Sequence, residues 1–331
     1  MKTFLKWLSG IILGLLILYS VGPKPSIPDF KPVEINLPSS LSELENFINT
    51  SEKSVRGLKP DNEARIIWAD TANREKTKIA FLYLHGFSAS QAEGAPVHTD
   101  LAKKYNANLY LSRLTEHGIE RGDSTMINLT ADEYEASAEK ALEIAKKLGD
   151  EVVVIGTSTG GALTLFLASR HPEIRAIVLY SPCVKLYDGT AVILNKHWGL
   201  QIARMVSGGP VKTFDSESKA HSNYWQLHYR IEALVALQNL VSSTMKPETF
   251  SKIKCPVFLG YYYKNDAEQD NTVSVPAMLK MYDELGTPED LKEKMAFPET
   301  GAHVISSYIR SKDWQGVERE TDKFLSDIVK L

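Results

Sequence analysis

The stretch that decides the fold is EVVVIGTSTGGALTLFLASRH, residues 151–171. It begins with a continuous run of β-branched apolar residues, which predicts a short buried strand, and it ends with apolar residues at helical spacing. Between them, GTSTGG places the Ser158 hydroxyl between Gly156 and Gly160. A sharp strand-to-helix turn strains its central residue and leaves room only for small neighbours. The stretch therefore predicts that Ser158 projects above the edge of a sheet as a nucleophile.

Two other kinds of glycine-rich site are excluded by particular residues. A phosphate-binding P-loop would need Lys followed by Ser or Thr after its last glycine, but Gly161 is followed by Ala162 and Leu163. A dinucleotide-binding fingerprint would need glycine at the position of Ser158. A helix start that Ser158 merely caps is the remaining structural alternative.

An activated serine needs a histidine to take its proton and a carboxylate to orient that histidine. His303, in KEKMAFPETGAHVI, follows the last predicted strand and precedes the final helix, and we expect it to be the base. The carboxylate should follow the strand PVFLGYYY, where Asp270 and Asp266 compete. We favour Asp270 because a helix, SVPAMLKMYDEL, starts soon after it and should hold it at the junction. Asp266 and Glu268 are then solvated loop charges.

The segment LYLHGFSAS, residues 82–90, supplies a site for the oxyanion. It ends a buried strand at His85 and then turns sharply. We expect the backbone N–H of Phe87 to point at the region above Ser158. The second donor is expected to be the N–H of Thr159, at the positive end of the following helix. His85 is expected to shape the turn rather than to transfer protons.

Strand and helix patterns alternate along the chain, which predicts an α/β fold with a mostly parallel sheet and helices on both faces. The predicted strands are residues 64–69, 78–84, 107–114, 151–155, 175–180, 255–263 and 292–297. The clearest helix is 131–148, with a capping box at Thr130 and Glu133 and a stop at Gly149. Residues 184–254 are too long for a crossover and rich in aromatic residues, so we expect a helical lid inserted before the penultimate strand.

The first thirty residues are not expected to belong to the fold. Lys2 and Lys6 precede the apolar run WLSGIILGLLILYSV, a pattern shared by secretory signals and membrane anchors. Pro23 should hinder cleavage, so we expect an uncleaved membrane anchor over 1–22, a Pro-rich linker over 23–40 and a catalytic domain outside the cytoplasm. A removed signal peptide and an exported soluble enzyme are the alternative.

Composition excludes several classes of partner. The chain of 331 residues has 38 basic and 41 acidic residues and a formal net charge of -3, which provides no basic surface for nucleic acid. Cys183 and Cys255 should lie at opposite edges of the sheet, about 17 to 20 Å apart. A disulfide needs a much closer approach, so two free thiols are expected. The sequence contains no zinc-ligand spacing and predicts no metal or cofactor, and no protein partner is inferred.

The chain resembles the α/β-hydrolase superfamily in HGF, GTSTGG, the acid near DNTV and the histidine of GAH, taken in that order. Within it, the chain is similar to the branch of monoacylglycerol lipases, carboxylesterases and serine aminopeptidases, over about residues 60–331. The expected organisation is a hydrolase core of 41–183 and 255–331 around the lid. RLTEHG lies where that branch carries a G-H-G turn, with Glu116 in place of the first glycine, so His117 is expected to be structural.

The resemblance and the residues imply hydrolysis of a carboxylic ester, an acylglycerol or small acyl ester, through an acyl-enzyme on Ser158. A serine aminopeptidase uses the same machinery and is the closest alternative. Asp215 and Glu217, within the expected lid, are the candidates to hold a free α-amine. An alternative from another class is a non-catalytic binding module of the cell envelope that keeps the turn around Ser158 as scaffold.

Overall fold

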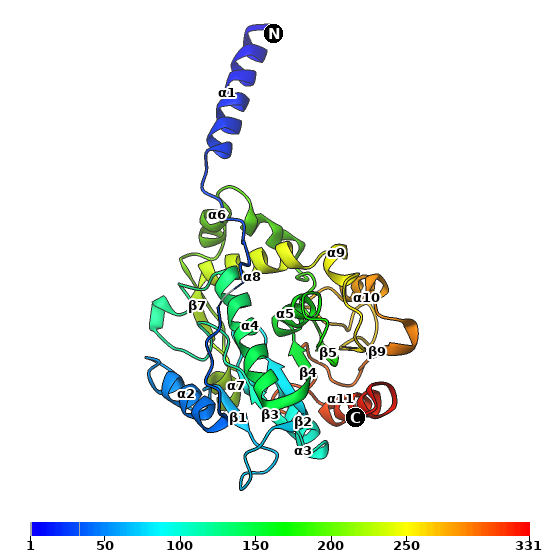
Figure 1. Ribbon diagram of the computed structural model, residues 1–331. Coiled ribbons are helices and arrows are strands. Elements are labelled where there is room, and N and C mark those ends of the chain that lie inside the picture. The colour runs from blue at the N-terminus through cyan, green and yellow to red at the C-terminus, as the bar shows by residue number, and fades with distance from the viewer. Residues whose placement is uncertain (1, 33) are drawn as a thin grey trace.

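A seven-stranded sheet lies at the centre of the computed structural model, which describes residues 2–32 and 34–331 (Figure 1). Its strands are β1 (Arg65–Ile67), β2 (Thr77–Leu84), β3 (Asn108–Leu111), β4 (Gly149–Thr157), β5 (Ala176–Tyr180), β8 (Val257–Tyr261) and β9 (Lys292–Ala296), in the spatial order β1-β3-β2-β4-β5-β8-β9. Strand β1 pairs antiparallel with β3, and the other neighbours are parallel. Each predicted strand is present, and the predicted mostly parallel α/β fold is confirmed.

Helices cover both faces of the sheet, because the strands are apolar on both faces. The core helices are α2 (Leu41–Lys53), α3 (Val97–Lys104), α4 (Ala131–Leu148), α5 (Thr159–Ala168), α10 (Val275–Glu284) and α11 (Trp314–Phe324). In β4, Val152 and Val154 join the cluster that contains α4, α5 and α10. Val153 and Ile155 join the cluster that contains α3 and α11. Continuous apolar strands thus define two cores, as a parallel sheet requires.

The predicted capping signals set the ends of α4. Thr130 lies in extended backbone, and its Oγ1 accepts the Glu133 N–H at 3.2 Å, while the Glu133 carboxylate lies 3.2 Å from the same hydroxyl. Gly149 follows as the C-cap. A serine or threonine N-cap is typically worth about 1 kcal/mol. The prediction of a helix over 131–148 is confirmed.

The segment between β5 and β8 contains more than helices. It comprises η3 (Gly189–Asn195), α6 (Gly199–Val206), β6 (Val211–Thr213), α7 (Lys219–Tyr224), β7 (His228–Arg230), α8 (Ile231–Thr244) and α9 (Pro247–Phe250). We call residues 184–254 the insertion. Strands β6 and β7 form a separate antiparallel pair that the sequence did not predict. Helix α8 packs on α4 and α5, which fixes the insertion to one face of the core.

Helix α1 (Lys2–Ser20) projects away from the rest of the protein (Figure 1). Its apolar side chains from Leu8 onward are exposed. Within the part of the chain that the structure describes, no helix combines the length and apolarity that a membrane span needs. The expected membrane anchor over 1–22 is therefore not supported.

The chain after α1 lies along the body of the protein. His197 Nδ1 approaches the Gly22 carbonyl oxygen at 2.6 Å, and the Trp198 N–H donates to the Pro23 carbonyl at 2.7 Å. Further on, the Phe30 N–H donates to the Asp132 carboxylate at 2.8 Å. The described part of the Pro-rich stretch up to residue 40 contains neither helix nor strand.

Candidate active site

Ser158 occupies the sharp turn between β4 and α5. Its backbone has φ 54° and ψ -117°, a sparsely populated conformation that stores strain. Glycine is required at positions 156 and 160, because neighbouring atoms leave no room for a Cβ. A Cβ on Gly156 would lie 2.3 Å from Thr164 Oγ1, and a Cβ on Gly160 would lie 2.0 Å from the Leu84 carbonyl oxygen. The small residues that the sequence analysis singled out therefore permit this turn.

His303 and Asp270 are in direct contact. His303 Nδ1 lies 2.6 Å from Asp270 Oδ2. The other carboxylate oxygen of Asp270 accepts the backbone N–H groups of Thr272 and Val273, at 2.8 and 3.0 Å. Asp270 is fully buried in the loop after β8. These contacts on both of its oxygens fix the orientation of the carboxylate.

The two groups stabilise each other's charged forms. Burial raises the pKa of Asp270, but the His303 charge and the hydrogen bonds it accepts outweigh burial and leave the pKa below its usual value. Burial lowers the pKa of His303, but Asp270, with a contribution from Glu93, outweighs burial and leaves that pKa raised. Asp270 is thus anionic near neutral pH, and His303 readily accepts a proton.

Asp266 lies elsewhere. Its carboxylate accepts the Tyr263 hydroxyl at 2.8 Å on an exposed loop. Glu268 pairs with Lys264 at 3.1 Å. Of the two competing aspartates, the structure therefore places Asp270 on the histidine and leaves Asp266 in solvated loop, as the helix-junction argument predicts.

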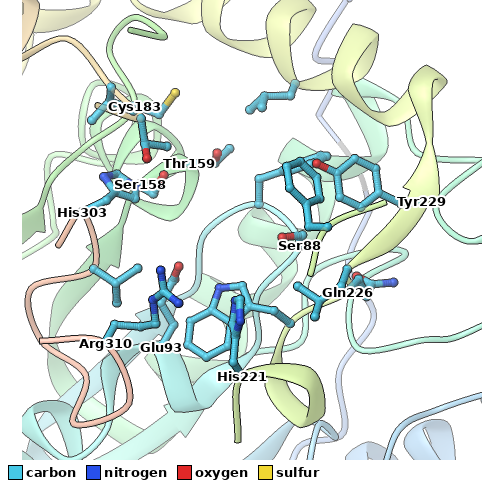
Figure 2. Close-up of a pocket in the computed structure, with 18 of the residues that line it drawn as sticks. Ser88, Glu93, Ser158, Thr159, Cys183, His221, Gln226, Tyr229, His303 and Arg310 are labelled. Carbon is cyan, nitrogen blue, oxygen red and sulfur yellow. The ribbon is translucent and has the colours of Figure 1, made fainter. Parts of the chain in front are cut away.

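Ser158 and His303 line the same cavity, and Figure 2 shows their side chains on the same side of it. His303 Nε2 is buried and has no hydrogen-bond partner among the residues that the structure describes. Hydrogen bonds between a nucleophile and its base are often long in a free enzyme and shorten when substrate binds. The imidazole is thus held through Nδ1, and Nε2 remains available as a proton acceptor.

The loop at residues 85–87, which we call the HGF loop, lies against Ser158. A Cβ on Gly86 would be 3.0 Å from Ser158 Cβ, so the loop backbone passes directly beside the nucleophile. His85 Nδ1 donates to the Gly86 carbonyl at 2.9 Å, and His85 Nε2 accepts the Leu114 N–H at 3.1 Å. Burial lowers the pKa of His85 to about 4, so it is neutral and holds the turn, as expected.

The residues of the two predicted oxyanion donors lie at the same cavity. Phe87 and Thr159 both line it. Within the described residues, neither backbone N–H has a hydrogen-bond acceptor. Thr159 begins α5, so its N–H lies at the positive end of the helix dipole. The structure thus places Phe87, Thr159, Ser158 and His303 around one space, and the role of the two N–H groups stays a prediction.

The turn at RLTEHG keeps its histidine in the core. His117 is fully buried, its Nδ1 lies 2.7 Å from the Thr115 carbonyl oxygen, and its ring stacks on Tyr134. Glu116 has φ 61°, the left-handed conformation that the missing glycine would adopt easily. His117 therefore has the structural place that the sequence analysis expected.

Glu93 is a site residue that the sequence analysis missed. It lies in η1 (Gln91–Gly94), is 2% exposed and lines the cavity. Its Oε2 accepts the Gly86 N–H and lies 3.4 Å from the Tyr83 hydroxyl. The sequence signal was weak, because an acid in a loop of small and polar residues is most often solvated.

The cavity has a volume of about 450 Å³ and two kinds of wall. Its apolar wall is lined by Phe87, Leu186, Phe214, Tyr229, Leu234, Leu237 and Val273. Ionisable side chains also line the cavity: Asp215, Glu217, His221 and Arg310. Glu217 pairs with Arg310, and burial lowers the pKa of His221, so the histidine is mainly neutral at pH 7. Asp215 and Glu217 thus do reach the space in front of Ser158.

The two cysteines are both free, as predicted, and Cys183 lines this cavity. Burial raises the pKa of its thiol to about 12. A thiol with such a pKa is protonated at neutral pH and is a poor nucleophile. Ser158 is accordingly the better candidate for nucleophilic attack in this space.

Comparison with known proteins gives one family and several relatives. The model of the family described as "BAAT / Acyl-CoA thioester hydrolase C terminal" matches residues 133–309, which is more than half of the 331-residue chain. A thermostable monoacylglycerol lipase from Bacillus sp. (strain H-257) is 27% identical over 187 residues, covering 56% of this chain and 70% of the relative. The matched family region contains Ser158, Asp270 and His303.

Solved structures are similar over most of the chain. A structure from a study of LipS and LipT, two metagenome-derived lipolytic enzymes, has a TM-score of 0.65 at 18% identity and covers 81% of this chain and 98% of that one. A soluble variant of monoglyceride lipase from Saccharomyces cerevisiae has a TM-score of 0.59 at 14% identity, covering 80% and 91%. The monoacylglycerol lipase from Paleococcus ferrophilus has a TM-score of 0.57 at 14% identity, covering 79% and 97%. At such identities the likeness concerns the fold.

Proposed function

The chain belongs to the BAAT / acyl-CoA thioester hydrolase C-terminal family and has the α/β-hydrolase fold, and from this premise we propose that it hydrolyses a carboxylic ester through an acyl-enzyme on Ser158. The observation that carries the proposal is the 2.6 Å contact between His303 Nδ1 and Asp270 Oδ2, with Nε2 left unpartnered in the cavity of Ser158. The family membership and the monoacylglycerol lipase relative support an ester as the substrate class.

The proposed reaction begins when His303 Nε2 takes the proton of Ser158 Oγ as the oxygen attacks the acyl carbon. Asp270 stabilises the imidazolium, and the N–H groups of Phe87 and Thr159 donate to the oxyanion. The tetrahedral intermediate collapses, the C–O bond to the alcohol breaks, and His303 gives its proton to the leaving oxygen. Water then attacks the acyl-enzyme with His303 again as base, which releases the acid and restores Ser158.

The lining of the cavity supports an apolar acyl group and an uncharged alcohol. The apolar wall, contributed largely by the insertion, suits an acyl chain and makes the insertion a lid over the substrate in this proposal. Among the described lining residues, Arg310 alone carries a permanent positive charge, whereas Glu93, Asp215 and Glu217 are acidic. A polyanionic leaving group such as coenzyme A would meet repulsion there, so an acylglycerol or small acyl ester is preferred.

A fluorophosphonate probe tests the nucleophile. The wild-type protein should be labelled, and Ser158→Ala should lose labelling and turnover of a p-nitrophenyl ester by about 10⁵- to 10⁶-fold, the size of effect seen when such a serine is removed. Ser169→Ala, at the far end of α5, is the matched control and should behave as wild type. An unlabelled wild-type protein would support the binding-module alternative.

Peptide-bond cleavage is the second candidate, because Asp215 and Glu217 line the cavity as an aminopeptidase would need. Glu217 is already neutralised by Arg310, so Asp215 is the carboxylate free to hold an α-amine. Acyl esters and amino-acid arylamides should be compared on the same preparation. Turnover of arylamides above esters, abolished by Asp215→Asn, would replace the esterase proposal.

Export of the catalytic domain stays a prediction that rests on Lys2, Lys6 and the apolar run after them. Cell fractionation, with mass spectrometry of the intact protein, tests it. Recovery of the protein in the cytoplasmic fraction with residues 1–22 intact would contradict export.

A further inference from the structure

The carboxylate of Glu93 is buried at the centre of the proposed site, and the reaction above gives it no role. Its Oε2 accepts the Gly86 N–H and lies 3.4 Å from the Tyr83 hydroxyl. The same hydroxyl lies 3.0 Å from Thr157 Oγ1. Thr157 is the residue directly before Ser158, so one acidic side chain joins the HGF loop to the strand that presents the nucleophile.

Glu93 also fixes the backbone on which the oxyanion donor depends. The Gly86 N–H is bound to Glu93, and the Gly86 carbonyl is bound to His85 Nδ1. A peptide unit is planar, with its C=O and N–H pointing in opposite directions. The Gly86 carbonyl and the Phe87 N–H belong to one peptide unit, which His85 holds directly. Glu93 holds the preceding peptide unit through the Gly86 N–H, so the two contacts together fix the backbone on both sides of the Gly86 Cα.

Packing around Gly86 leaves no room for a side chain at this position. A Cβ on Gly86 would lie 2.8 Å from Glu93 Oε1 and 3.0 Å from Ser158 Cβ. The loop backbone is thus confined between the Glu93 carboxylate and the nucleophile. η1 itself is tied to the loop that carries His303, since Ser307 Oγ donates to the Ala92 carbonyl at 2.8 Å.

The charge of Glu93 acts on His303. Burial raises the pKa of Glu93 to about 7, whereas the Gly86 N–H, the His303 charge and the Tyr83 hydroxyl oppose that rise. The charged groups that act on His303 are Asp270 and Glu93, which favour the imidazolium, and Arg310, which disfavours it. Attraction between Glu93 and His303 is greatest when the imidazole is protonated, which in the proposed reaction is the tetrahedral stage. An interaction that strengthens there lowers the barrier.

We propose that Glu93 is a positioning residue for ester hydrolysis, whose carboxylate holds the Gly86 peptide for the oxyanion loop and supports the positive charge of His303 in the tetrahedral stage. The inference rests on the proposed function, because it acts through His303 and Phe87. It adds a second acid to the site. Glu93 precedes Ser158 in the sequence, whereas Asp270 follows it.

Glu93→Gln keeps the size of the side chain and an oxygen that can accept the Gly86 N–H, but removes the charge. We expect kcat for a p-nitrophenyl ester to fall about 10-fold with KM nearly unchanged, because the lost interaction belongs to the transition state. The acid limb of the kcat/KM profile should move to lower pH, since His303 loses one group that raises its pKa. Glu93→Ala removes the acceptor as well, and the loss should reach about 10²- to 10³-fold, as for loss of an oxyanion donor.

Glu135→Gln is the matched control. Glu135 is 1% exposed, and burial raises its pKa to about 7 as for Glu93, but it lies on α4 and pairs with Arg170 away from the cavity. This variant should retain the kcat, KM and pH profile of the wild type. Thermal unfolding of both Gln variants shows whether either has lost its fold.

The outcomes separate the two proposals. If the wild type hydrolyses esters and Glu93→Gln matches Glu135→Gln in kcat and in the acid limb, Glu93 has no positioning role and the esterase function stands. A folded Glu93→Gln with raised KM and unchanged kcat also overturns the positioning role. If the wild type neither hydrolyses esters nor is labelled by the fluorophosphonate, the proposed function fails, and the inference fails with it.

Discussion

The two walls of the cavity are built in different ways. The core wall contains Ser158 and Glu93, with Asp270 behind His303, and each of the three is nearly or fully buried. Backbone N–H groups hold the carboxylates of Asp270 and Glu93. The wall from the insertion is mixed: Tyr229 and Leu237 are buried, whereas Phe214 is exposed and the side chain of Glu217 is 66% exposed. In the proposed function, the core wall positions the chemistry and the insertion selects the substrate.

The largest expected effect is on the core wall. Asp270→Asn should lower kcat about 10⁴-fold, because the amide favours the wrong tautomer of His303 and no longer stabilises the imidazolium. Turnover of a p-nitrophenyl ester measures this. Asp266→Asn, four positions earlier in the same loop, should leave turnover nearly unchanged. The reverse pattern would transfer the role to Asp266.

A change in the insertion should act on selectivity instead. Leu234, on α8, lines the apolar wall, and Leu234→Ala should lengthen the space for the acyl chain. We expect the ratio of kcat/KM for decanoyl over acetyl p-nitrophenyl esters to rise about 10-fold, within the range that one or two buried methylenes provide. The kcat for the acetyl ester should change little. A uniform loss across all chain lengths would break the proposed division between the walls.

The smallest expected effect concerns the acid limb, the pH range in which kcat/KM falls as the pH decreases. His303 must be neutral to accept the Ser158 proton, and its pKa is raised above the usual 6.5, because Asp270 and Glu93 together outweigh burial. Activity should therefore fall as pH drops through this raised value, so that the limb lies above 6.5 in the wild type. A kcat/KM profile between pH 5 and 9 measures it. A limb below 6.5 would show that burial dominates at His303.

Much of this arrangement was predictable because its determinants are local. The turn at Ser158 follows from small residues between an apolar strand and a helix. Helix α4 has its ends set by Thr130, Glu133 and Gly149, which lie within one turn of those ends. The choice of Asp270 followed from the helix that starts soon after it, although the N–H groups that hold its carboxylate became visible in the structure.

The features that the sequence did not reveal depend on distant partners. The β6–β7 pair was not predicted, because its short strands show no clear alternation of apolar and polar residues. The ion pair of Glu217 with Arg310 joins the insertion to the loop after His303. Glu93 is an ordinary loop acid until the fold buries it against Gly86 and near His303.

By itself, the sequence determined the alternation of strands and helices, the strained turn at Ser158 and the candidates for base and acid, since these follow from side-chain size and periodicity over short stretches. The tertiary structure alone decided which of these groups share one cavity, that Glu93 is buried beside them, and that Asp215 and Glu217 reach the same space. The reason is physical: burial and charge coupling depend on which distant segments the packed sheet brings to the same edge.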